Sequence, residues 1–241
     1  MPTIRVKNAG AWTELAQLFV KDAGTWKQPI GAWTKAGGVW QKCWPPVADG
    51  TTGVETNTPG PGSVVVPAGV TRMQITIAGG GGGGGSLSRT ASDDFFGGGG
   101  GGSSGLLANV DVAVTPGETV NYVCGNLGAG GIFDSRFYGT PGDPGLHSSV
   151  TALSVHHEVS GGQGGQPSNQ CGGSTGCGGA GGTPNGVTGA NGIFPPYGGP
   201  GGAGGVNALG QGNGGTGGGQ QNGNVAQPGA VGYVKIVWFN V

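Results

Sequence analysis

The chain has 241 residues, of which 62 are glycine and only 9% are charged. The formal net charge of −1 excludes a broad basic face for nucleic acid, and the scarcity of charge argues against a solvated disordered tail. No apolar run approaches the roughly 20 residues of a membrane span. Residues 1–10 lack the apolar core of a secretory signal, so we expect synthesis in a cytoplasm.

Residues 1–46 are repetitive, because Trp12, Trp26 and Trp40 are 14 residues apart, and each follows shortly after an Ala-Gly or Gly-Gly pair. Asn or Asp followed by Ala-Gly between β-forming residues is typical of a hairpin, so we predict small β-hairpin repeats. This stretch has too little core to stand alone, and we expect it to dock on another protein or on its own copies. The alternative is a small subdomain packed on the rest of the chain. The candidate attachment and assembly residues are Trp12, Trp26, Trp33, Trp40 and Trp44.

Residues 47–62 have the Pro-, Gly- and Thr-rich composition of a linker, which leaves 63–241 as one glycine-rich domain. Strands are predicted at 64–66 and 70–78, and a further strand at 149–160. The stretch 107–124 is predicted to be a hairpin that turns at Pro116–Gly117. The last strand, 230–241, presents Tyr233, Lys235 and Phe239 on one face and has to pair with earlier strands. The glycine tract before it is therefore an insertion held at both ends.

Many glycines recur every third residue, as in GGQGGQ (161–166), GGAGGT (178–183) and GGPGGAGG (198–205). Period three fits neither an α-helix nor a strand, and it is the period of the polyproline-II helix. Such helices have no internal hydrogen bonds, so packed side by side they need partners on their neighbours, and only glycine allows that approach. The predicted fold class is therefore mainly β, with a β-sheet scaffold that carries packed polyglycine-II helices. Collagen is excluded by the short repeats, while a flexible linker stays open, chiefly for 79–105.

The turns between these helices are predicted at 92–96, 132–145 and 193–197, where most aromatic residues of the region lie. Exposed aromatic side chains bind sugars and protein loops at low entropic cost. The alternative is that they close the ends of the bundle as small cores. The candidate recognition residues are Asp94, Phe95, Phe96, Phe133, Arg136, Phe137, Tyr138, Phe194 and Tyr197.

Catalytic and metal-binding patterns are weak, so we expect no enzyme, no cofactor and no metal site. His156 and His157 would point to opposite faces of a strand and cannot share one ion. No P-loop, nucleophile elbow or EF-hand is present. Cys171 and Cys177 flank a flexible GGSTG and could form a disulfide, the alternative being four free thiols.

Three stretches resemble the glycine-rich domain found in many bacteriophage tail proteins: VVVPAGVTRMQITIAGGGGGGG (64–85), LLANVDVAVTPGETVNYVCGN (106–126) and GAVGYVKIVW (229–238). The glycine-rich region is similar to tail-fibre tip adhesins whose distal domain is a sandwich of polyglycine-II helices. VKDAGTWK (20–27) and KAGGVWQ (35–41) resemble repeats of phage tail and tail-tip proteins.

The resemblance implies a virion structural protein at the distal tail, at the tail tip or fibre end, that recognises a host receptor through loops on a polyglycine scaffold. The implied partners are other phage tail proteins and a host cell-surface receptor, protein or glycan, with no nucleic acid. The resemblance also implies a homotrimer that is made in the host cytoplasm and located in the virion. The alternatives are an ice- or surface-binding polyglycine-II protein, a purely structural tail cap without receptor binding, and a cellular adhesin.

Overall fold

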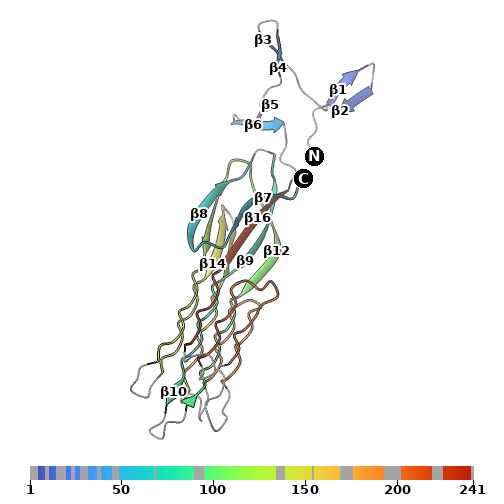
Figure 1. Ribbon diagram of the computed structural model, residues 1–241. Helices are drawn as coiled ribbons and strands as arrows, with labels where there is room; N and C mark the ends of the chain where they lie inside the picture. Colours follow the sequence, from blue (N-terminus) through green and yellow to red (C-terminus); the bar gives the residue numbers. More distant parts are fainter. Residues whose placement is uncertain are drawn as a thin grey trace.

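The computed structural model describes residues 5–8, 11–14, 20–22, 25–27, 32–36, 39–44, 49–67, 69–89, 95–133, 139–153, 155–168, 176–192, 202–218 and 225–239. Within these ranges the chain forms β-strands and extended segments, and no helix. Figure 1 shows three parts, which are small hairpins, a β-sandwich and a long bundle of glycine-rich segments.

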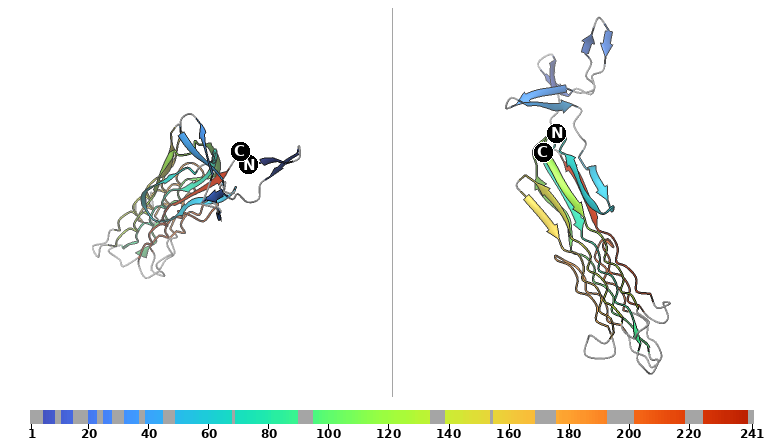
Figure 2. Two further views of the ribbon diagram at one scale, coloured as in Figure 1. Left: turned by 90° about the horizontal axis from the view of Figure 1, so that it is seen from above. Right: turned by 90° about the vertical axis from the view of Figure 1, so that its left-hand side faces the viewer.

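The first part consists of two-stranded antiparallel hairpins, as the tryptophan repeat predicted (Figure 2). The hairpins pair β1 with β2, β3 with β4, and β5 with β6. Their strands are β1 (Arg5–Asn8), β2 (Ala11–Glu14), β3 (Val20–Asp22), β4 (Thr25–Lys27), β5 (Ala32–Ala36) and β6 (Val39–Trp44).

The second part is a sandwich of two four-stranded antiparallel sheets with one hydrophobic core between them. The strand orders are β12-β9-β16-β7 and β15-β14-β13-β8. Alternation places the core: Val234, Ile236 and Trp238 of β16 are buried, while the residues between them face outward. The strands are β7 (Thr51–Thr56), β8 (Gly60–Val65), β9 (Arg72–Ala78), β12 (Leu106–Ala113), β13 (Thr119–Cys124), β14 (Ser148–Ala152), β15 (Val155–Val159) and β16 (Tyr233–Phe239).

The structure corrects three predictions of local structure. The stretch 107–124 is not a hairpin, because β12 pairs with β9 while β13 pairs with β8 and β14, so its turn crosses from one sheet to the other. The single strand predicted at 149–160 is the hairpin of β14 and β15. Residues 47–62, whose composition indicated a linker, contain β7 and the start of β8, which pair with β16 and β13. Turn-forming residues in these positions join or begin strands whose pairing is decided by the core.

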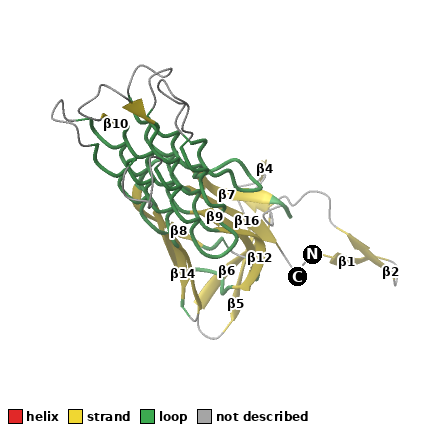
Figure 3. Cartoon of the chain, turned by 90° about the horizontal axis from the view of Figure 1, so that it is seen from below, coloured by secondary structure: helices red, strands yellow, loops and turns green. Residues whose placement is uncertain are grey.

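The third part is a bundle of extended segments that extends from one end of the sandwich (Figures 1 and 3). Five connections separate the segments in pairs, and the first of these includes the short strands β10 (Ser88–Arg89) and β11 (Phe95–Phe96). We name the segments s1 (79–87), s2 (97–105), s3 (125–132), s4 (139–147), s5 (160–168), s6 (176–183), s7 (184–192), s8 (202–207), s9 (212–218) and s10 (225–232).

Hydrogen bonds between segments follow a period of three residues. In s1 the amides of Gly79, Gly82 and Gly85 donate to carbonyl oxygens of s2, at 2.8–3.3 Å. The next amide in each triplet donates to s4, and the third donates to s10. The s1 carbonyl oxygens accept, with the same period, from s3, s5 and s9. Segment s1 is therefore hydrogen-bonded to six neighbours, and its backbone groups are satisfied without a β-ladder.

Segment s2 is surrounded in the same way, by s1, s5, s6, s7, s8 and s9. The other eight segments form a closed ring in chain order, since each one is hydrogen-bonded to the next and s10 is bonded back to s3. The first two segments of the chain are thus the centre of the bundle, and the later eight enclose them. All residues of s1 and s2 are buried, so the flexible linker considered for 79–105 is wrong for these segments.

Glycine is required at many positions where two segments face each other. A Cβ atom on Gly83 would lie 1.9 Å from the carbonyl oxygen of Ala129, and one on Gly100 would lie 2.1 Å from that of Ala203. In s3 every third residue faces inward, as Gly125, Gly128 and Gly131 do, while in s5 two residues of each triplet are buried glycines, as Gly161 and Gly162 are. The GGx and Gxx repeats therefore encode whether a segment has two or one buried sides.

Ser148 joins the sandwich to the bundle. Its buried hydroxyl donates to the carbonyl oxygen of Ala78 at 2.8 Å and accepts from the amide of Gly125 at 2.8 Å. Ala78 is the last residue of β9, and Gly125 is the first residue of s3. One side chain thereby holds together the points at which two strands become bundle segments.

Candidate functional site at the distal end of the bundle

All five connections between paired segments leave the bundle at the same end, opposite the sandwich. Odd-numbered segments run away from the sandwich and even-numbered segments return, because each partner register is antiparallel: Gly82 is bonded to Gly102, and Gly85 to Gly99. The described residues beside every connection therefore lie together at the distal end (Figure 1).

Two buried serines stabilise this distal end. The hydroxyl of Ser88 donates to the carbonyl oxygen of Ser168 at 3.1 Å, and the hydroxyl of Ser168 donates to the carbonyl oxygen of Phe96 at 3.3 Å. The amide of Gly139 also donates to the Ser88 hydroxyl, at 3.2 Å. Side-chain bonds thus connect the ends of s1 and s5 with the beginnings of s2 and s4. Sequence reasoning missed these serines, since a lone serine beside a glycine run carries no pattern.

Three of the predicted recognition residues lie in the described ranges at this end. Phe95 and Phe96 form β11, which pairs with β10 in the register Arg89 to Phe95. Phe133 forms an isolated bridge with Gly139, and its side chain is half-buried. Outside the described residues lie Asp94, Arg136, Phe137, Tyr138, Phe194 and Tyr197.

The turn predicted at 132–145 is too long. Gly139, Gly142 and Gly145 belong to s4, where Gly142 and Gly145 donate to the carbonyl oxygens of Gly165 and Gly162, each at 2.9 Å. The single glycines in GTPGDPG keep the period of three, so this stretch packs as a bundle segment. The candidate recognition residues of this connection therefore all lie before s4.

The five candidate assembly tryptophans all lie in hairpin strands. Trp12, Trp26 and Trp40 stand opposite Lys7, Lys21 and Lys35 in their hairpins, so the three hairpins share one register. Trp33 stands opposite Lys42, and Trp44 opposite Ala32. Sequence reasoning found the tryptophan period but missed the lysine period that accompanies it.

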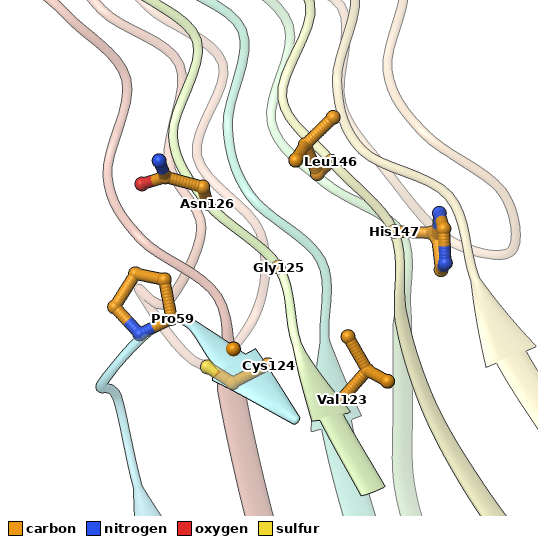
Figure 4. Close-up of a pocket in the computed structure, with 8 residues that line it drawn as sticks. Pro59, Val123, Cys124, Gly125, Asn126, Leu146 and His147 are labelled. Atoms are coloured by element: carbon orange, nitrogen blue, oxygen red, sulfur yellow. The ribbon is translucent and has the colours of Figure 1, made fainter.

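A pocket of about 290 Å³ lies where the sandwich meets the bundle (Figure 4). Cys124 and Pro59 lie together in this pocket, with His147 on its other side. Burial raises the pKa of the Cys124 thiol, which disfavours the thiolate that nucleophilic chemistry requires. The pocket therefore lacks an activated cysteine.

Cys177 is disulfide-bonded, and Cys124 is a free thiol. Cys171, the expected partner of Cys177, lies outside the described residues. In the described ranges no group of three or more histidine, cysteine, aspartate or glutamate side chains could hold a metal ion. A search of the same ranges for a helix long and apolar enough to cross a membrane finds none.

Comparison with protein families gives one match, to the glycine-rich domain, over residues 55–239. The match begins in β7 and ends with the last residue of β16, so it covers nearly all of the sandwich and the whole bundle. No curated protein matches the chain.

Proposed function

Since the chain belongs to the glycine-rich domain family, we propose that it is a bacteriophage virion protein at the distal tail that recognises a host receptor through the loops of its bundle. It acts by surface complementarity, without catalysis. Its receptor is a protein or glycan of the host surface, and its other partners are tail proteins.

The scaffold of this proposal is a bundle of polyglycine-II helices. The supporting observation is the period of three in the hydrogen bonds of s1 and s2, each with six neighbours. A helix with three residues per turn directs successive N–H and C=O groups to three sides, and a β-strand directs them to two. Glycine backbone chemical shifts in s1 test this assignment. They should report the backbone dihedral angles of the polyproline-II region, and angles of the antiparallel β region would contradict it.

The scaffold assigns recognition to the loops, because the backbone of the bundle has its hydrogen bonds satisfied internally and has little left to bind a ligand. The closing arrangement of Ser88 and Ser168 gives the loops a rigid base. Loops on a rigid scaffold carry binding in many proteins. The aromatic and charged residues proposed above supply contact area and polarity.

The hairpins of residues 1–46 are proposed to attach the protein to the tail, through the tryptophans of their shared register. Two-stranded hairpins are marginally stable alone, and association would bury them. We propose a homotrimer, for which light scattering should give three chain masses. A folded monomer at micromolar concentration would contradict the trimer but leave the loops as the recognition site.

The decisive experiment replaces Phe137, Tyr138 and Tyr197 with serine in the virion. Host adsorption should fall about 10-fold or more, because aromatic anchors at an interface typically contribute about 1–2 kcal/mol or more each. The thermal unfolding of the purified protein should be unchanged.

The matched control replaces apolar residues on the sides of the bundle, in Leu146→Ser, Val187→Ser and Val206→Ser, whose side chains are exposed. This control should adsorb normally. If the loop variant also adsorbs normally, receptor binding lies elsewhere on the particle and the protein is a structural tail cap. Thermal hysteresis of the purified protein would instead indicate an ice-binding protein.

A further inference from the structure

A second cavity, of about 370 Å³, lies on the outer face of the sheet β12-β9-β16-β7, beside the bundle. Its volume is within the range of small-molecule sites. Side chains from three strands and from the turn between s8 and s9 line it. The residues that carry the argument are Gln74, Thr76, Asn109, Leu209, Tyr233 and Lys235.

The floor of the cavity holds polar groups in fixed positions. The Thr76 hydroxyl donates to Oδ1 of Asn109 at 3.4 Å and accepts from the backbone N–H of Asn109 at 3.1 Å. Nε2 of Gln74 donates to Asp111 at 3.3 Å. Asn109 occupies a β-bulge with φ of 55°, which aims its side chain differently from a regular strand residue. Within the described chain these bonds leave Nδ2 of Asn109 as a donor and Oε1 of Gln74 as an acceptor.

The walls of the cavity are apolar. Tyr233 and Val237 come from β16, and Leu209, which is 45% exposed, comes from the turn 207–212. This turn is held by Asn207, whose buried side chain accepts from the Leu209 amide at 3.2 Å and donates to the carbonyl oxygen of Gln211. The apolar wall is thus preformed and spans the junction of sandwich and bundle.

The charges beside the cavity are compensated. Lys235 lies 3.2 Å from the carboxylate of Glu55, and the Tyr233 hydroxyl donates to the same carboxylate at 2.6 Å. Arg72 lies 2.9 Å from Asp111. A net charge on the ligand therefore has no uncompensated partner among the described residues there, which favours a neutral ligand.

We propose that this cavity binds a neutral saccharide. A pyranose ring has an apolar C–H face, which fits against Tyr233 and Leu209, and hydroxyl groups that both donate and accept, which suit Gln74, Thr76 and Asn109. The site is separate from the distal loops and does not rest on their proposed role. Its test needs only the purified protein.

The test titrates the full chain with maltose, lactose, cellobiose and chitobiose and follows backbone and side-chain amide resonances. At least one disaccharide at about 10 mM, roughly ten times a dissociation constant of about 1 mM, should shift the Asn109 and Gln74 side-chain resonances. Asn109→Asp should weaken this binding about 10-fold, because it loses the free donor Nδ2, and Gln74→Leu should weaken it similarly, because it loses the free acceptor Oε1. Leu209→Ser should weaken it as well.

The matched control is Asn126→Asp, which makes the same change at an exposed asparagine of s3 and should bind like the natural chain. The proposal is overturned if none of the four disaccharides shifts these resonances, or if the shifts are the same in Asn109→Asp as in Asn126→Asp. Either result leaves the adsorption experiment on the loops unaffected.

Discussion

The amide of Gly82 donates to the carbonyl oxygen of Gly102 at 3.0 Å, which joins the two central segments of the bundle. Each of these glycines also faces a ring segment. A Cβ atom on Gly82 would lie 2.1 Å from the carbonyl oxygen of Gln163, and one on Gly102 would lie 2.1 Å from that of Ala180. The ring segments s5 and s6 therefore leave no room for a side chain on either of these hydrogen-bonded glycines.

Gly82→Ala and Gly102→Ala should each destabilise the protein by about 3 kcal/mol or more, because the clash is with backbone that has to shift the neighbouring segments. Chemical denaturation of the purified protein measures this loss. Ala129→Val and Ala203→Val enlarge exposed residues of the ring and should change the unfolding free energy by less than about 0.5 kcal/mol. Equal stability of Gly82→Ala and Ala129→Val would contradict the packing of the bundle.

Amide hydrogen exchange should show two patterns in the bundle. The amides of residues 79–86 in s1 and 98–105 in s2 are all hydrogen-bonded, so all of them should exchange slowly. In s3 only Gly128 and Gly131 donate to s1, so these two should exchange at least about 100-fold more slowly than Ala129 and Gly130. Residue-resolved NMR measures both patterns. Uniform exchange along s3, whether fast or slow, would be inconsistent with hydrogen bonds at every third residue.

Ser148→Ala should lower the unfolding free energy by about 2 kcal/mol. The substitution leaves the buried amide of Gly125 without its acceptor at the junction of sandwich and bundle. The control Ser63→Ala removes an exposed hydroxyl in β8 and should have little effect. Denaturant titration distinguishes them, and a Ser148→Ala protein as stable as the control would show that another group satisfies Gly125.

The phenol of Tyr233 should have a raised pKa in the folded protein. Burial and the hydrogen bond to Glu55 raise the pKa of its phenol from 10.0 to about 12. The folded state then retains a proton that the unfolded state loses, so this contribution to stability is complete below pH 10 and is lost as the pH rises to about 12. Ultraviolet difference titration of the natural chain against Tyr233→Phe measures the phenol.

Tyr233→Phe should also flatten the fall in unfolding free energy between pH 10 and 12. At low pH the same hydrogen bond affects stability through Glu55. The hydrogen bond from Tyr233 lowers the pKa of Glu55 below 4.5, so the stability from this pair is present above that value and is lost on further acidification. A phenol that titrates near 10 in the folded protein would rule out the Tyr233–Glu55 bond.

Local pattern predicted much of the architecture. The alternation that puts Tyr233, Lys235 and Phe239 on one face predicted a strand over 230–241, and β16 lies within that range; its pairing with earlier strands follows from its position after an insertion. The hairpins of the N-terminal region followed from turn chemistry at Asp22 and its equivalents. Long-range choices failed, since Pro116–Gly117 turns the chain equally well within a sheet or between sheets, and the shared core decided between them.

The candidate sites were also predicted in part from the sequence and in part only by the structure. Aromatic residues between glycine runs mark the distal connections in the sequence, and Phe96 and Phe133 lie there. The saccharide cavity had no sequence signal, because Gln74, Asn109 and Leu209 come from two strands and a distant turn. Outward positions of strands are polar in most proteins, so each residue alone carries no signal and only their convergence is informative.

By itself the sequence determined that the glycine segments approach closely and repeat every third residue, because only glycine lacks the Cβ atom that would prevent contact between backbones. The tertiary structure decided which segments occupy the centre. Segments s1 and s2 are adjacent to β9 and β12, whose strands lie side by side, and the ring then follows chain order from s3 to s10. Glycine segments without side chains do not determine which other segment each one packs against. The sandwich strands, which fix the ends of the segments, therefore determine the order of the segments in the bundle.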